Sequence, residues 1–101
     1  MDFRDDKIEG PYLITSDLRM GGMITVGATV RSGVTLELTG MIIGDLHVQR
    51  GAKAIIHGTV DGIVRNEGYV DVDGNIGGLI DLSPEARSVV APGTLVKGVR
   101  R

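Results

Sequence analysis

The sequence predicts an all-β protein, a parallel β-solenoid of about five short coils with 16–19 residues each. A phrase of glycines and apolar residues recurs, and its first glycines are Gly40, Gly58, Gly74 and Gly93, so the spacings are 18, 16 and 19 residues. Within each copy apolar and polar residues alternate, and no segment sustains a 3.6-residue period. Such a period is too short for a βαβ unit and suits one winding of a solenoid.

The composition agrees with a narrow solenoid interior. The chain has 101 residues, which favours a single domain, and its 16 glycines indicate frequent turns. Aromatic residues make up only 3% of the chain, so the core has to consist of aliphatic side chains and methionine. The absence of cysteine excludes disulfides and thiolate-bound zinc.

The charge pattern limits the classes of partner. A formal net charge of -2 gives no reason to expect binding to nucleic acid or to an anionic membrane. No apolar run approaches the roughly 20 residues of a membrane helix, so we expect no transmembrane segment. The charged start of the chain lacks the apolar core of a signal peptide, and we expect a cytoplasmic location.

Three regions are expected along the chain. Residues 1–12 are polar and charged, and we predict an N-terminal arm that covers the first coil as a cap. The β-helix domain is predicted to span residues 13–98, and residues 99–101 to form a short C-terminal tail. The segment 17–26 fits the later repeat poorly, so it is expected to form an irregular first coil.

The regular coils start after Gly27. Residues 30–40 align with residues 48–58 without a gap, and residues 68–74 follow at an offset of 16. A fourth copy begins at Ala86, and the segment 83–87 is interpreted as a turn between coils. The alternation predicts that one side of each strand points inward. The inward residues of the four copies are expected to be Leu36, Leu38, Ala54, Ile56, Val70, Val72, Ser88 and Val90.

The repeated phrase also resembles a known family. It reads apolar-x-Gly-x-apolar-x-Gly-x-apolar, most clearly in Ile56-His57-Gly58-Thr59-Val60-Asp61-Gly62-Ile63. It resembles the repeat of the bactofilin, or polymer-forming cytoskeletal, family over residues 25–98. The resemblance implies a right-handed parallel β-helix with a triangular cross-section, and the handedness comes from the resemblance alone. It further implies a non-catalytic bacterial scaffold that self-assembles through the ends of its β-helix.

One outward face is a candidate partner surface. Stacked coils place equivalent residues about 4.8 Å apart in columns. Apolar residues stand among charged ones in the outward columns, which suits a protein-binding patch, although ordinary neighbours on a solvated sheet produce the same pattern. The candidate face consists of Lys53, Ile55, His57, Tyr69, Asp71, Asp73, Arg87 and Val89.

The ends of the solenoid offer a second kind of surface, because the first and last coils carry unpaired strand edges. Pro92, Lys97 and the two terminal arginines are typical of blocked edges. Two functional hypotheses follow. One is the self-assembling scaffold, and the alternative is a small protein-binding β-solenoid, such as an immunity protein that neutralises a toxin through its flat face.

No catalytic, metal or cofactor residues are predicted. His47 and His57 are expected on different faces, and no third ligand joins them at metal spacing. His57 is expected to stack beside Asp73, which is interpreted as a structural pair because no nucleophile or cleft accompanies it. The segment 71–75 lacks the later glutamate of a calcium loop. Four short coils supply little room for a polysaccharide-cleaving site, so we expect a protein partner and no enzyme.

Overall fold

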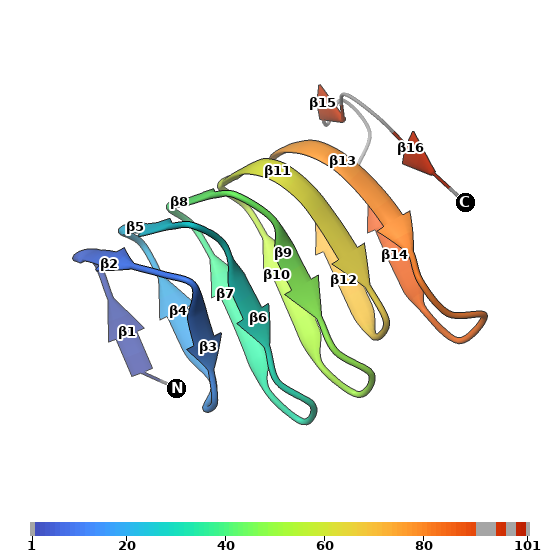
Figure 1. Cartoon of the computed structure of the whole chain (residues 1–101), viewed down its shortest axis with the longest axis horizontal. Helices are drawn as coiled ribbons and strands as arrows, with labels where there is room; N and C mark the ends of the chain where they lie inside the picture. The colour runs from blue at the N-terminus through green and yellow to red at the C-terminus, as the bar shows by residue number, and fades with distance from the viewer. Residues whose placement is uncertain (1, 91–94, 97–98, 101) are drawn as a thin grey trace.

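The computed structural model describes residues 2–90, 95–96 and 99–100, and these residues form a parallel β-solenoid (Figure 1). The described residues form strands and turns with no helix, so no helix among them is long and apolar enough to cross a membrane. The chain winds about one axis for about five turns, from β1 at one end to β14, β15 and β16 at the other. The predicted fold class is confirmed.

Each turn of the solenoid contributes strand segments to three faces, here called A, B and C. Face A is a six-stranded parallel sheet. Its strands, in spatial order, are β1 (Asp2–Arg4), β4 (Leu18–Met20), β7 (Thr35–Leu38), β10 (Lys53–Ile56), β12 (Tyr69–Val72) and β14 (Arg87–Val90).

Faces B and C are joined in the later coils, because β11 and β13 run around the corner between them. A shift of register between Val60 and Ile63 marks that corner. Face B contains β2 (Lys7–Glu9), β5 (Met23–Thr25), β8 (Met41–Ile43), the first parts of β11 (Thr59–Asn66) and β13 (Asn75–Asp81), and β15 (Leu95–Val96). Face C contains β3 (Tyr12–Ile14), β6 (Ala28–Val30), β9 (Leu46–Val48), the second parts of β11 and β13, and β16 (Val99–Arg100).

The core is a stack of apolar side chains along the axis. Each strand of face A points alternate residues inward, so Leu18, Leu36, Ala54 and Val70 follow one another in register. All four are buried, and so are Leu38, Ile56 and Val72, which confirms the predicted inward residues of the first three copies. In the fourth copy, Ser88 is only partly buried. Val90 has its predicted register opposite Val72 but is 40% exposed, because β14 is the last described strand of its face.

The repeated glycines have a steric cause at the corner between faces A and B. A Cβ atom added to Gly22, Gly40, Gly58 or Gly74 would lie only 1.9–2.1 Å from a carbonyl oxygen of the preceding coil. No side chain tolerates a contact that short. These four residues, the A–B corner glycines, therefore allow successive coils to stack closely, which is why glycine recurs with the period of the coil.

The first coil begins earlier than the sequence analysis expects. Residues 2–9, expected to be part of an arm, form β1 and β2, which pair in parallel with β4 and β5. The segment 17–26 is also regular, since Leu18 lies opposite Leu36 and Ile24 opposite Ile42. Charged residues at inward positions hide the alternation of the first coil. At the other end, Val99 and Arg100 of the expected tail pair with β13.

Candidate functional site

The structure brings the residues of the candidate partner face together on face A. Lys53, Tyr69 and Arg87 occupy one column on β10, β12 and β14, and the Lys53 Nζ lies 5.4 Å from the centre of the Tyr69 ring. Ile55, Asp71 and Val89 form the adjacent column in the same register. All eight predicted residues thus lie on, or directly after, three neighbouring strands, and we call them the face A patch.

The face A patch is mixed in character rather than broadly apolar. His57 follows β10 and Asp73 follows β12, and their Nδ1 and Oδ2 atoms are 3.5 Å apart, so the predicted neighbour pair is confirmed. Ile55 and Tyr69 are partly buried between charged neighbours, whereas Val89 is 49% exposed at the edge of the patch. The apolar area is therefore largest toward β14.

At the C-terminal end of the solenoid, β14 offers a strand edge. The Arg87 amide donates to the Gly68 carbonyl at 2.8 Å, which directs the backbone groups of Arg87 toward the coil below. Backbone groups alternate in direction along a parallel strand, so those of Ser88 and Val90 face away from β12. No described strand pairs with that edge. Val89 and Val90 leave apolar surface exposed beside it.

A buried polar network lies just inside this end. The Asn66 side chain is fully buried, and its amide nitrogen donates to the Arg87 carbonyl at 2.7 Å and to Asp81 at 3.2 Å. Its oxygen accepts from the Gly68 amide at 2.9 Å, and the Ser88 hydroxyl donates to Asp81 at 3.0 Å. Sequence reasoning missed this network. One feature of the sequence could have indicated it: Asn66 occupies the inward position that Val48 occupies one coil earlier.

At the N-terminal end, charged residues occupy the positions that apolar residues fill elsewhere. Asp2 lies opposite Leu18 and Arg4 opposite Met20, so both stand in inward columns. Arg4 binds the Asp6 carboxylate through two nitrogens at 2.8 and 3.2 Å, and a third nitrogen lies 3.5 Å from the Tyr12 hydroxyl. We call Asp2, Arg4, Asp6 and Tyr12 the N-terminal plug.

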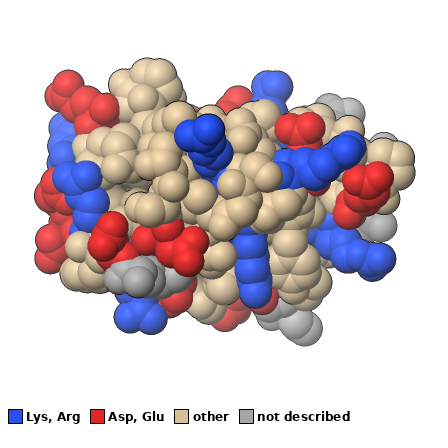
Figure 2. All heavy atoms as spheres, turned by 90° about the horizontal axis from the view of Figure 1, so that it is seen from below, with Lys and Arg blue, Asp and Glu red and all other residues tan. Residues whose placement is uncertain are grey.

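Within the plug, opposite charges hold Arg4 and Asp6 together. The hydrogen bond from Arg4 is the main cause that lowers the pKa of Asp6, and the same contact raises the pKa of Arg4. Figure 2 shows acidic and basic side chains together over this end of the molecule, at the left of the view. The inward columns of face A begin with the charged residues Asp2 and Arg4 and end with the uncharged Ser88 and Val90, so the two ends differ at these positions.

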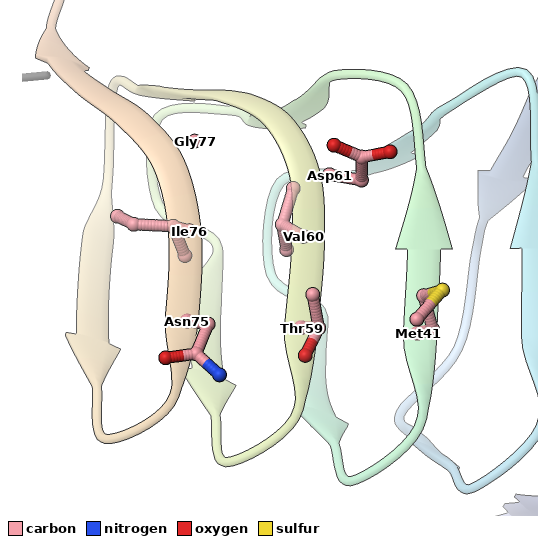
Figure 3. A pocket seen from close by; sticks show the side chains of 7 residues that line it. All are labelled: Met41, Thr59, Val60, Asp61, Asn75, Ile76 and Gly77. Carbon is pink, nitrogen blue, oxygen red and sulfur yellow. The ribbon is translucent and has the colours of Figure 1, made fainter. Parts of the chain in front are cut away.

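Neither hollow on face B has the features of a catalytic site. One of about 220 Å³ is lined by residues of β8, β11 and β13, among them Met41, Thr59 and Asn75 (Figure 3). Asp61 is the only ionisable residue in its lining. A longer groove of about 510 Å³ follows the A–B corner, where the glycines leave no side chains. Acid–base chemistry needs two converging groups, and neither lining presents an orienting pair around a nucleophile.

The remaining titratable groups lie in dispersed pairs. The His47 Nε2 is 2.5 Å from a Glu67 oxygen on face C, away from His57, as the predicted separation of the two histidines requires. Among the described residues no three histidine, aspartate or glutamate side chains are grouped closely enough to hold a metal ion.

Comparisons with protein-family models, with curated proteins and with solved structures found no match. The candidate functional surfaces of this chain are therefore the two ends of the solenoid and the face A patch.

Proposed function

We propose that this protein is a non-catalytic structural protein that associates with a second copy of itself through the C-terminal end of its β-solenoid. The observation that carries the proposal is the outer edge of β14, where the backbone groups of Ser88 and Val90 face away from β12 and no strand of the described residues pairs with them. A parallel strand edge with exposed apolar side chains readily pairs with another chain. Val89 and Val90 supply that apolar surface.

The dimensions of the molecule set the strength of such an association. The principal extents are 32 × 26 × 21 Å, so an end face offers on the order of 300–500 Å² to a partner, near the lower limit for specific interfaces. We therefore expect a weak pair that forms at high protein concentration. In a filament or on a surface, where copies are held close together, the same contact gains from effective concentration.

Sedimentation velocity over a wide range of protein concentration tests the proposal. The wild-type mass should rise from one chain to two as concentration increases. Val90→Pro should keep the protein monomeric, because it removes a donor that faces outward and leaves the bonds to β12 intact. Val89→Lys should also weaken the pair through repulsion between like charges.

Leu13→Lys is the matched control for the lysine variant. Leu13 is 50% exposed on the outward side of β3, and Val89 is 49% exposed, so both changes place a lysine at a similarly exposed aliphatic position. The control should pair like the wild type. A wild-type protein that stays monomeric throughout, or a pair that Val90→Pro leaves intact, would contradict the proposal.

A second candidate function is a protein-binding module, such as an immunity protein, that acts through the face A patch. The observation that favours it is the alignment of the eight patch residues on three adjacent strands, with Val89 exposed at the margin. The triple variant Ile55→Ala, Tyr69→Ala, Val89→Ala should then abolish inhibition of a toxin encoded beside this chain. The matched control replaces three outward residues of face C by alanine, namely Thr29, His47 and Arg65. Equal inhibition of the toxin by both variants would exclude the face A patch as the binding surface.

A further inference from the structure

We infer that the first coil is a built-in stop, which closes the N-terminal end of the solenoid to the C-terminal end of a second copy and so limits assembly to a tail-to-tail pair. The inference rests on the proposed association through β14. Beyond that association, the two ends of the solenoid are not equivalent. Particular residues of the first coil prevent copies from stacking head to tail into longer assemblies.

The first component of the stop is steric. Gly22 is an A–B corner glycine, and the carbonyl below its missing Cβ belongs to Asp6, which holds the corner position of the first coil. Each of the next four corners has glycine there, because a Cβ would lie 1.9–2.1 Å from the carbonyl oxygen of the coil beneath it. Asp6 has a Cβ. A carbonyl oxygen placed below Asp6 at the spacing of the described coils would collide with that Cβ.

The second component is electrostatic. A copy stacked on the first coil would continue the inward columns and enclose Asp2 and Arg4. On one side lie the apolar residues of the second coil, and on the other lie the uncharged Ser88 and Val90 of the added copy. Arg4 has the Asp6 carboxylate as its partner, yet both side chains now stand partly in water, and stacking would remove that water. Desolvation of ions is unfavourable enough to offset the attraction between them. The plug therefore opposes stacking even where the backbones fit.

The C-terminal end differs at the corresponding positions of face A. Val90 stands in the column that begins with Arg4, and Ser88 in the column that begins with Asp2. Neither is charged. When a twofold axis brings two such ends together, each end covers the other. No C-terminal end then remains for a third chain, so the contact closes after two chains. An open end on each side of every copy would instead produce a growing stack.

The experiment opens the N-terminal end and asks whether longer assemblies form. The variant Asp2→Leu, Arg4→Leu, Asp6→Gly restores apolar residues to the inward columns and glycine to the corner. Its mass, measured by sedimentation velocity and electron microscopy at concentrations where the wild type pairs, should rise well beyond twofold, with stacks many chains long. Asp6→Gly alone introduces the residue found at the next four corners, and it should give shorter, concentration-dependent stacks.

A matched control separates end opening from general adhesiveness. Arg19→Leu, Glu37→Leu, Asp61→Gly removes one base and two acids and adds the same residues at outward positions of the second, third and fourth coils, where Arg19 and Asp61 are exposed and Glu37 is partly buried. It should pair like the wild type. Circular dichroism and thermal unfolding confirm that each variant folds.

The possible outcomes are distinguishable. A wild type that elongates by itself, or an opened variant that stays at the wild-type mass, overturns the stop. Elongation of the control to the same extent also overturns it. If the wild type remains monomeric while the opened variant assembles, the proposed pairing through β14 fails but the stop stands. A wild-type pair with an opened variant that also ends at two chains refutes the stop alone.

Discussion

Replacing Gly58 by alanine should strongly destabilise the solenoid, because the new Cβ would lie 1.9 Å from the carbonyl oxygen of Gly40. The two coils would have to separate by more than an ångström at this corner. Two backbone hydrogen bonds cross the coils there, from Gly58 to Leu38 and from Thr59 to Gly40, each at 2.9 Å. The loss of both hydrogen bonds should lower the unfolding free energy by about 2 kcal/mol, and the overpacking should lower it by about 1–3 kcal/mol more. We therefore expect a total loss of roughly 3–5 kcal/mol.

Urea denaturation followed by circular dichroism measures this loss, and thermal unfolding should show a decrease in Tm of roughly 12 °C or more. Gly33→Ala is the comparison. An added Cβ there meets nothing within 4 Å, but φ is 82°, so the cost comes from backbone strain alone and should be about 1–2 kcal/mol. Gly33→Asn should cost less, because asparagine tolerates this conformation. Equal losses for Gly58→Ala and Gly33→Ala would refute the steric explanation of the repeat.

Three further predictions concern the polar contacts. Asn66→Ala should lower the unfolding free energy by about 2–4 kcal/mol, because it leaves buried polar groups without hydrogen-bond partners. Asn75→Ala, at an exposed site, should lower it by under about 0.5 kcal/mol. Similar urea midpoints for the two variants would contradict this prediction. Arg4 lowers the pKa of Asp6 from its ordinary value of 3.8 in the folded state, so the contact stabilises the fold above that value and the gain disappears as pH falls through the lowered pKa. The urea midpoint of Asp6→Asn should therefore lie below that of the wild type at pH 7, and the difference should vanish in strong acid; a difference that persists there argues against the contact. A double-mutant cycle on the half-exposed pair of His47 and Glu67 should give a coupling below about 1 kcal/mol, and a larger coupling would show that exposure does not weaken this pair.

The periodic part of the fold was predictable from the sequence. Gly40, Gly58 and Gly74 recur because close stacking of coils excludes a Cβ, and Leu36, Ala54 and Val70 alternate with polar residues because one side of each strand is buried. Both signals are local and repeated, so aligning the copies also placed Lys53 beside Tyr69 and His57 beside Asp73. The relative positions of the face A patch residues were thus predicted correctly from the sequence, and the role of the patch stays a prediction.

The conformation and contacts of the residues at the two ends became clear only from the tertiary structure. A strand in the middle of the solenoid has a coil on each side, and its residues obey the repeat, whereas Asp2, Arg4 and Asp6 have a coil of the described residues on one side only. Charged side chains are acceptable there because water still reaches them, and they hide the very pattern that identifies a coil. Likewise, Asn66 is satisfied by Asp81 and by the Arg87 carbonyl, groups 15 and 21 residues further along the chain. Repetition shows which residues are equivalent, but exposure and polar pairing depend on what lies above and below each of them.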